Sequence, residues 1–491
     1  MATQYGQHRL LEIIPGALIW TTLVFAVVFS FVAPAVAIVF IIVFDLYWLF
    51  RVIYFVLYLF YSWRRYHQEV AVDWFSELQK ISDWQKVYHV IFLPTYKESH
   101  EIMKAALLAL KTSTYPTKQM IVVLAGEERD AAHFRQSAER LVREFDGVFF
   151  KLLTTIHPAN LSDEIPGKGS NLHWSGNEVK KTIDALAIPY EHIVASAFDI
   201  DTIAHPQYFA RLTHAFLTTP NPLRTSYQPV TTFSNNIWSA TAPVRVASFG
   251  TTFWMLTELS RSERMWTFSS HSMPWQMLVD VGFWEKDMVS EDSRIFLQGL
   301  LHYHGDYRVT PIFLPVSMDA VSGKTYLDSL KALYKQQRRW AWGVEHFPYM
   351  VPKFLKDKQM PLRIKVKYVF NHVEGMYTWA TAPILIFILG YLPLFVSHEA
   401  SSVLVAVTPF TLEWIMRLAM IGVLTSGILS MTMLPGRPAH VKKGTWIVMI
   451  VQWAVLPITF VLFGSLPAID AQTRLMLGKY LGFNVTKKER N

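Results

Sequence analysis

Residues 193–206, Ile-Val-Ala-Ser-Ala-Phe-Asp-Ile-Asp-Thr-Ile-Ala-His-Pro, decide the fold. The apolar run 193–198 predicts a buried strand. Asp199 and Asp201 follow it, one residue apart. In an open α/β sheet, ligands bind beyond the carboxyl ends of the strands, where two carboxylates suit a hard divalent cation that in turn holds a phosphate. Aspartates are also common in ordinary turns, so the pair gains weight only from the segments on either side.

The segments before this stretch alternate between strand and helix patterns. Strands are predicted at 90–93, 120–124 and 148–153, and helices at 100–112, 131–145 and 171–186. Such alternation predicts a doubly wound, mostly parallel sheet, within a soluble domain that we assign to residues 66–345. A nucleotide is then expected along the loops that follow the strands.

Those loops carry polar residues in order along the chain. Pro94-Thr95-Tyr96-Lys97-Glu98 follows the first strand, and 125–130, with acidic Glu127, Glu128 and Asp130, follows the second. In 166–172 a glycine-containing turn places Lys168 at a helix start, which suits an anion such as a diphosphate. The spacing is not that of a Walker loop.

Two further segments come after the aspartate pair. Residues 266–273 precede an apolar helical pattern, and residues 287–294 contain a third acidic candidate, Asp292. Ser290 or Asp292 could equally serve as a helix cap, because an apolar helical run follows them.

Residues 324–345 predict an amphipathic helix that ends in Gln336-Gln337-Arg338-Arg339-Trp340-Ala341-Trp342-Gly343. Cations and indoles together suit a helix at the membrane interface. Alternatively, an indole offers a flat face to a sugar ring while arginine and glutamine supply hydrogen bonds.

The ends of the chain are apolar, and 52% of the 491 residues are hydrophobic. Spans are predicted at 13–33 and 36–61, and Arg64 and Arg65 then place both ends of this hairpin, residues 1–65, in the cytosol. Asp45 and Arg51 inside the second span either pair with other helices or line a polar path. The net charge of +8 fits this positive-inside bias and anionic lipid, and no nucleic-acid module is present. The absence of cysteine excludes disulfides and thiolate chemistry.

The C-terminal membrane region, assigned to 346–466, contains apolar spans at 370–396, 412–434 and 446–466. Three spans would send the basic tail 467–491 to the outside, away from the cytosolic domain. Pro457 in the third span could mark a broken or re-entrant helix, or 403–434 could contain an extra crossing, which leaves five or six spans. Residues 467–481 predict another interface helix.

At this point the chain resembles membrane-embedded family-two glycosyltransferases, the group of cellulose, hyaluronan and chitin synthases. The matching segments lie in the family's order. They are Pro94–Glu98 (P-x-Y-x-E), Asp199–Asp201 (D-x-D), Ser290–Asp292 (T-E-D, with Ser for Thr), Gln336–Trp340 (Q-x-x-R-W) and Phe483–Lys488 (the F-x-V-T-x-K gating loop of cellulose-synthase-like enzymes). The resemblance implies a GT-A-like cytosolic domain inserted between transmembrane segments, in a multi-pass protein of the plasma membrane.

The resemblance also implies roles for the residues of the site. Asp292 is the expected general base, and Asp199 and Asp201 are expected to hold the diphosphate through Mg²⁺ or Mn²⁺. The expected nucleotide-sugar contacts are Thr95, Tyr96, Glu98, Glu127, Lys168, Asp199, Gln336 and Arg339, with the choice among Glu127, Glu128 and Asp130 left open. The expected acceptor contacts are Trp340, Phe268, His271 and Ser272. The expected gating-loop residues are Phe483, Val485, Thr486 and Lys488.

The expected reaction is attack of an acceptor hydroxyl on the anomeric carbon of a nucleotide sugar, with UDP as the nucleotide, which inverts that centre. Processive synthesis of a β-linked polysaccharide with transport across the membrane is the leading interpretation. Transfer of one sugar to a lipid acceptor and a non-catalytic transport or binding subunit are the alternatives. Sugar, linkage, oligomeric state and any export partner are left open.

Overall fold

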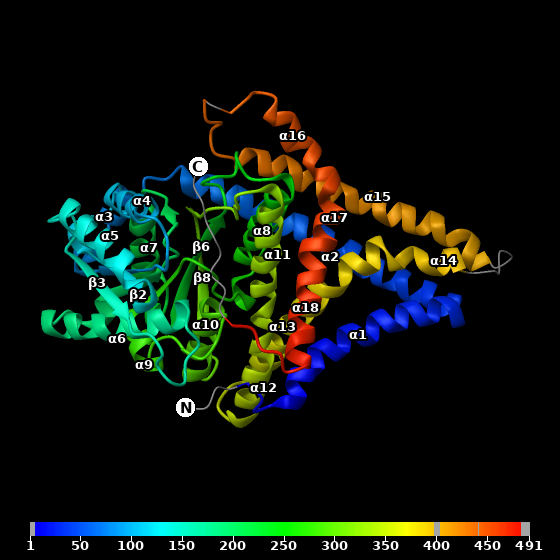
Figure 1. The fold of residues 1–491 in the computed structure, drawn as a ribbon, viewed down its shortest axis with the longest axis horizontal. Helices are drawn as coiled ribbons and strands as arrows, with labels where there is room; N and C mark the ends of the chain where they lie inside the picture. Colours follow the sequence, from blue (N-terminus) through cyan, green and yellow to red (C-terminus); the bar gives the residue numbers. More distant parts are fainter. Residues whose placement is uncertain (1–4, 397–402, 440, 483–491) are drawn as a thin grey trace.

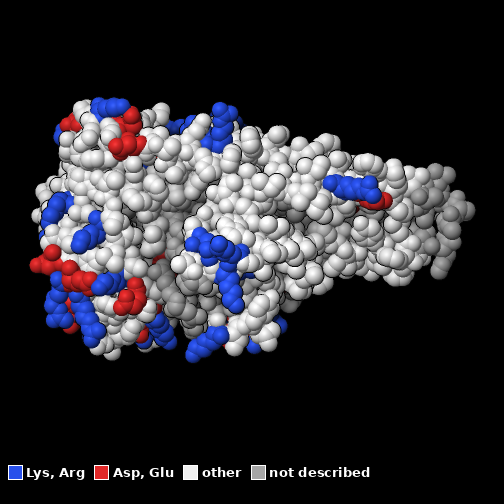
Figure 2. Space-filling model, turned by 90° about the horizontal axis from the view of Figure 1, so that it is seen from above, with Lys and Arg blue, Asp and Glu red and all other residues white. Residues whose placement is uncertain are grey.

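The computed structural model describes residues 5–396, 403–439 and 441–482. It has two parts, a sheet covered by short helices and an elongated group of long apolar helices (Figure 1). On the face seen in Figure 2, charged side chains gather over the sheet part, whereas the elongated part is nearly all uncharged.

One mixed sheet of eight strands forms the centre of the first part, in the order β3-β2-β1-β4-β7-β6-β8-β5. β3, β2, β1 and β4 are parallel to one another, as are β6 and β8, while β7 and β5 are antiparallel to their neighbours. The predicted mostly parallel, GT-A-like sheet is therefore confirmed. The strands are β1 Tyr88–Pro94, β2 Met120–Glu127, β3 Lys151–His157, β4 Ile193–Ala197, β5 Ile203–Ala204, β6 Thr225–Thr232, β7 His271–Pro274 and β8 Arg308–Ser317.

Alternate residues of the central strands enter two different cores. In β1, Val90 and Phe92 pack on one face and Ile91 and Leu93 on the other, which explains why the central strands are continuous apolar runs. Helices α3 (Trp74–Gln79), α4 (His100–Lys111), α5 (Ala131–Glu144) and α7 (Tyr208–Thr218) cover the second face. Helices α6 (Lys168–Leu186), α8 (Ala242–Leu259), α9 (Trp275–Val281) and α10 (Glu291–His302) cover the first.

Among the described residues, four helices are long and apolar enough to cross a bilayer, or five if a bent pair forms one span. They are α1 (Arg9–Val32), α2 (Pro34–Val70), α15 (Val403–Thr432) and the run Thr445–Met476, with α13 (Leu362–Phe387) and α14 (Leu392–Val396) as the bent pair. The sequence left five or six spans open, and the described residues supply four or five candidates. α2 has 37 residues, about 55 Å of helix, so it extends beyond a bilayer of about 30 Å and packs on α8 and β8.

The run Thr445–Met476 is not a straight helix. It comprises α16 (Thr445–Val451), a 3-10 turn, α17 (Leu456–Phe460), a π-helical turn at Val461–Ser465 and α18 (Leu466–Met476). Pro457, the residue predicted to interrupt this stretch, lies in the first turn of α17, directly after the 3-10 turn Gln452–Val455 where the break begins. In Figure 1, α17 and α18 run steeply across the direction of α1 and α15.

The predicted amphipathic helix 324–345 is α11 (Tyr326–Ala341), continued by the 3-10 turn Trp342–Glu345 and by α12 (His346–Lys356). The side chain of Thr325 caps α11 by accepting a hydrogen bond from the amide of Asp328. α11 lies against α18, and Arg338 forms an ion pair with Asp470 at 2.8 Å. α11 and α18 therefore lie between the sheet and the long helices (Figure 1).

Candidate active site

A cavity of about 1240 Å³ is lined by loops at the carboxyl ends of the strands and by the long helices. At the sheet end its lining contains predicted nucleotide-sugar and base residues, from Thr95 to Asp292, and at the other end residues of α2, α13 and α17. The predicted site residues that line it are Thr95, Tyr96, Glu98, Glu127, Lys168, Asp199, Phe268, Asp292, Gln336, Arg339 and Trp340.

The loop after β1 is held by its own glutamate. Glu98 Oε2 accepts hydrogen bonds from the Thr95 hydroxyl at 2.9 Å and from the Tyr96 amide at 2.5 Å. Lys97 takes a positive φ of 69°, which turns the chain sharply there. Tyr96 carries the guanidinium of Arg129 over its ring, 4.7 Å from the ring centre.

The three acidic residues after β2 have different surroundings. Asp130 accepts a hydrogen bond from the Lys97 amide at 2.9 Å, and Glu128 accepts one from the Ala159 amide at 2.7 Å, so both hold neighbouring backbone. Glu127 is buried at the end of β2, contacts His157 at 3.2 Å and Arg129 at 3.1 Å, and is the one of the three that lines the cavity. Which of the three contacts the base of the donor stays a prediction, and Glu127 is the one whose side chain borders the cavity.

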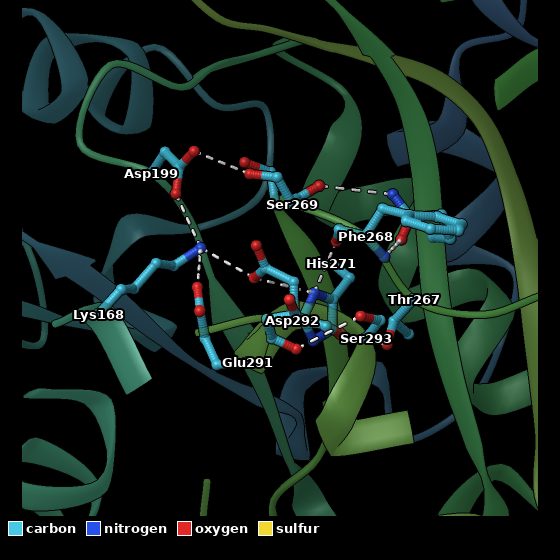
Figure 3. Close-up of polar contacts among 12 residues, drawn as sticks. Lys168, Asp199, Thr267, Phe268, Ser269, His271, Glu291, Asp292 and Ser293 are labelled. Carbon is cyan, nitrogen blue, oxygen red and sulfur yellow. Dashed lines mark hydrogen bonds and ion pairs between the residues drawn. The ribbon is translucent and has the colours of Figure 1, made fainter. Parts of the chain in front are cut away.

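Lys168 is the centre of the charged cluster (Figure 3). Its ammonium lies 2.7 Å from Asp199 Oδ1, 2.8 Å from Asp292 Oδ1 and 3.5 Å from Glu291 Oε1. Burial alone would lower the pKa of Lys168, but the three carboxylates raise it well above its usual range. Lys168 is thus a permanent cation that joins the D-x-D aspartate to the predicted base.

Close helix packing brings these groups together. Lys168 begins α6 and Asp292 lies in the first turn of α10. A Cβ at Gly169 would lie 3.2 Å from Glu291 Cβ, so glycine allows α6 to approach α10 this closely. Burial, reinforced by the Asp292 carboxylate, raises the pKa of Glu291.

Asp199 and Asp201 point to different places. Asp199 lines the cavity, where Ser269 donates a hydrogen bond to its Oδ2 at 2.9 Å. Asp201 is fully buried, and its Oδ2 accepts a hydrogen bond from the Asp319 amide at 2.8 Å. Within the described ranges, no three His, Cys, Asp or Glu side chains gather as a ready metal cluster. Mg²⁺ in nucleotide sites is, however, commonly held by one or two carboxylates together with phosphates, and Asp199 fits that donor set.

The segment expected to touch the acceptor divides in two. Phe268 lines the cavity and packs edge-on against Trp254, with the ring centres 4.8 Å apart. Ser272 is fully buried and hydrogen-bonds Ser196 at 2.7 Å and Tyr208 at 3.0 Å. His271 is also buried, and burial lowers its pKa to about 4, so the neutral ring donates from Nδ1 to the Phe268 carbonyl at 2.8 Å. His271 and Ser272 therefore lie behind the cavity wall, whereas Phe268 borders the cavity, and the acceptor contacts stay a prediction.

The end of α11 supplies the opposite wall. Gln336, Arg339 and Trp340 line the cavity, as the Q-x-x-R-W pattern leads one to expect for donor and acceptor contacts. The Trp340 ring packs at 5.7 Å from that of Phe233. The predicted gating-loop residues Phe483, Val485, Thr486 and Lys488 lie outside the described residues.

Sequence reasoning missed several side chains that hold the site. Ser269 on Asp199 lay within a segment already singled out, so its neighbours could have identified it. Thr267, whose hydroxyl donates to the Asp292 carbonyl at 2.6 Å, lay in the same segment. Glu345, which accepts hydrogen bonds from the amides before Asp292, had no signal beyond a position just after α11.

Among solved structures, the chain is similar to the mannosyltransferase PcManGT from Pyrobaculum calidifontis in complex with GDP-Man and Mn²⁺. The identity is 14%, 82% of this chain and 98% of that chain are covered, and the TM-score is 0.41. It is also similar to S. aureus TarS 1-349 in complex with UDP, with 10% identity, 72% and 95% covered and a TM-score of 0.35.

No curated protein sequence matches the chain. The family described as glycosyl transferase family group 2 matches residues 197–466, which is more than half of the chain and includes Asp199, the charged end of α10, the whole of α11 and several long apolar helices. This match agrees with the GT-A-like sheet and with the position of the cavity beyond its strands. The protein is therefore a glycosyltransferase, a member of glycosyl transferase family group 2.

Proposed function

We propose that the protein elongates a β-linked polysaccharide from a UDP-sugar, with inversion at the anomeric carbon, and passes the product through the membrane half of its cavity. The observation that carries this proposal is that one cavity is lined both by the donor-end residues and by helices long enough to cross a bilayer. A single-addition enzyme does not need such a passage for its product. The choice of UDP rests on the resemblance of residues 94–98 to the family's uridine-binding segment.

The membrane half of the cavity has the chemistry of a glycan path. The indole side chains of Trp379 and Trp453 line it and offer flat apolar faces to sugar rings. Several buried polar atoms in its wall have no hydrogen-bond partner among the described residues, namely Asp45 Oδ1, Trp48 Nε1, Asn371 Oδ1, His372 Nε2 and Trp453 Nε1. Buried polar atoms are almost always satisfied, so these positions make the wall polar in places and ordered water would satisfy them.

In the proposed reaction the acceptor hydroxyl forms a bond to the anomeric carbon as the bond from that carbon to the diphosphate oxygen breaks. Asp292 takes the hydroxyl proton, a contribution of about 10²–10⁴-fold for a well-placed base. The charge that develops on the nucleoside diphosphate is stabilised by Lys168 and by Arg339 from the opposite wall. Glu127 and Tyr96 bind the base end of the donor, and Trp340 and Phe268 bind the acceptor sugar.

A divalent metal ion, Mg²⁺ or Mn²⁺, would neutralise the diphosphate. Asp199 is the residue that would hold it, because its carboxylate lines the cavity. Asp201 would support the site indirectly, because its carboxylate accepts the hydrogen bond of the Asp319 amide and so holds the backbone there.

For the membrane part we propose four crossings, made by α1, α2, the α13–α14 pair and α15. The run 445–476 then lies along the membrane surface. Because the number of crossings is even, both ends of the chain lie on the side of the membrane that holds the sheet. Its direction across α1 and α15 in Figure 1 supports this arrangement. The chain then consists of a membrane hairpin (1–65), a catalytic domain (66–345), a membrane region (346–466) and a surface segment (467–491). The protein lies in the plasma membrane with its catalytic domain in the cytosol.

The proposal is tested with membrane vesicles that contain the protein, a panel of radiolabelled nucleotide sugars, and Mg²⁺ or Mn²⁺. We expect long chains from one donor, sized by chromatography, and none from the Asp292→Asn variant. A single labelled sugar that extracts with lipid would instead establish transfer to a lipid acceptor. Equal incorporation by the wild type and Asp292→Asn would refute the assigned base.

A further inference from the structure

The carboxylate of Glu345 is buried and takes part in four hydrogen bonds. Its Oε1 accepts from the backbone amides of Val289 at 3.3 Å and Ser290 at 3.0 Å. Its Oε2 accepts from the indole of Trp342 at 3.0 Å and from the hydroxyl of Tyr5. All four partners are donors, so they match an ionised carboxylate, which only accepts.

Two of these donors lie immediately before the predicted base. Ser290 is the residue before α10, and Asp292 is the second residue of that helix. The amides that Glu345 holds therefore fix the backbone from which the Asp292 side chain reaches into the cavity. Because Glu345 ends the 3-10 turn that continues α11, it also links that backbone to the helix that carries Gln336 and Arg339.

The residues after Glu345 continue the same attachment. His346 contacts the Ser293 hydroxyl at 2.7 Å through Nε2 and accepts from Arg294 Nε at 3.2 Å through Nδ1. Arg294 also donates to Glu285 at 2.7 Å, and Glu285 accepts from the Tyr349 hydroxyl at 2.7 Å. The first turn of α10 is thus tied to the start of α12 at several points.

Tyr5 brings the N-terminal segment to the same place. Its ring stacks on that of Tyr480, with centres 4.5 Å apart, and the Tyr480 hydroxyl donates to Glu12 at 3.0 Å. Arg9 donates to Glu12 at 2.7 Å and to the carbonyl of Leu475, in α18, at 2.8 Å. A segment far from Asp292 in sequence therefore closes the network around the Glu345 carboxylate.

We propose that Glu345 is a positioning residue for the reaction and that Tyr5 is the group that fixes its carboxylate. Glu345 sets the place of Asp292 relative to α11 without touching donor or acceptor, since neither Glu345 nor Tyr5 lines the cavity. A displacement of about 1 Å in a catalytic group can cost about 10²-fold in rate. This inference rests on the proposed role of Asp292, and it adds residues 5–12 to the parts on which the rate depends.

The test uses the full-length protein in vesicles and measures kcat and the donor KM separately. Glu345→Gln removes one of the two accepting oxygens, and we expect kcat to fall about 100-fold, the cost of a displacement of about 1 Å. Tyr5→Phe removes one hydroxyl and keeps the ring stack on Tyr480, and we expect kcat to fall about 10-fold. The donor KM should change less than twofold in both variants, because the base-binding residues lie on other loops.

Tyr115→Phe is the matched control. The Tyr115 hydroxyl is buried and donates to the Val87 carbonyl at 2.7 Å, as Tyr5 donates to Glu345, but it lies in the other core, away from α10. Its kcat should equal that of the wild type. The double variant Tyr5→Phe/Glu345→Gln should be no slower than Glu345→Gln alone, because both changes remove the same constraint.

Three outcomes would overturn the inference: a kcat for Tyr5→Phe equal to the wild type, equal losses in Tyr5→Phe and Tyr115→Phe, or a raised donor KM as the main effect. Since Tyr5→Phe alters a single hydroxyl, it tests the inference even where Glu345→Gln does not accumulate. Activity in Asp292→Asn would refute the proposed base itself. Loss in Asp292→Asn with wild-type rates in both other variants would refute only the role of Glu345 and Tyr5.

Discussion

Replacing Lys168 by methionine tests the charge arrangement of the site most directly. The ammonium lies within 2.8 Å of both Asp199 and Asp292, whose side chains are 26% and 23% exposed, while Lys168 itself is 9% exposed. At an effective dielectric constant of about 20, each contact is worth about 6 kcal/mol before desolvation is counted. Removing one member of a buried ion pair typically costs about 3–5 kcal/mol, and partial exposure of the partners moves the expected loss to the lower end.

The effect on catalysis should exceed the effect on stability. Lys168→Met removes a cation beside the proposed diphosphate position and leaves Asp199, Glu291 and Asp292 close together without their shared partner. Loss of one donor to a developing negative charge costs about 10²–10³-fold in kcat. We therefore expect kcat to fall at least 100-fold, while the protein still elutes as a folded species in detergent.

The assay is incorporation of radiolabelled sugar in vesicles with the protein amount matched by blotting. Lys180→Met on the same helix is the control, because Lys180 pairs with Asp184 at an exposed position, with side chains 34% and 44% exposed. That variant should keep the wild-type rate. Lys168→Arg, which preserves the charge, should recover part of the activity. A Lys168→Met enzyme with more than a third of the wild-type kcat would refute the reasoning.

Four other predictions follow from particular positions. Gly375 lines the cavity, and a Cβ there meets nothing within 4 Å, so a leucine side chain would project into the cavity. Gly375→Leu should therefore shorten the product on a sizing column without slowing the first transfer. Gly444→Leu, also in open space but away from the cavity, is its control. Asp199→Asn should raise the Mn²⁺ concentration needed for half-maximal activity, and chelation should abolish wild-type activity reversibly. Burial lowers the pKa of His89 to about 3, against about 6.5 in the unfolded chain. Between these two pH values the unfolded state binds more protons, so the free energy of unfolding should fall by about 1.4 kcal/mol for each pH unit that the pH drops. His89→Gln should flatten that slope in thermal unfolding. Because the chain has no cysteine, the variant Lys479→Cys, at an exposed position, should react with an impermeant maleimide only from the side of the catalytic domain.

Strands β1, β2 and β4 of the parallel half were readable from sequence because they are buried on both faces, whereas β3, at the edge, is only partly buried. Runs such as 120–124 leave no alternative to a central strand, and the structure extends this one to Met120–Glu127. The third strand was expected at 148–153 and begins instead at Lys151, because Gly147 takes a positive φ of 65° in the turn before it. The antiparallel strands were not predicted. β7 is only four residues long, and β5 only two, too short for a periodic pattern.

Site residues could be predicted where they stand in a short motif of the sequence. Contacts between residues that are far apart in the sequence could not be predicted. Lys168 was noticed as a cation at a helix start, but its contact with Asp292 depends on the approach of α6 to α10. Asp201 looked equivalent to Asp199, yet the backbone turns it toward residue 319. The partnership of Tyr5 with Glu345 spans 340 residues, and no local pattern carries such information.

The topology that we propose would resolve the parity conflict in the C-terminal region through the broken run 445–476. An uninterrupted apolar helix of this length satisfies every backbone group and would cross the bilayer. Here a proline and a π-helical turn interrupt it, and α18 carries Asp470 and Arg474, which pair with each other, while Asp470 also pairs with Arg338 on α11. Charges that must meet α11 hold this stretch at the surface of the sheet domain. With the four crossings that we propose before it, Tyr480 is expected on the side of the active site, and in the structure its ring stacks on that of Tyr5.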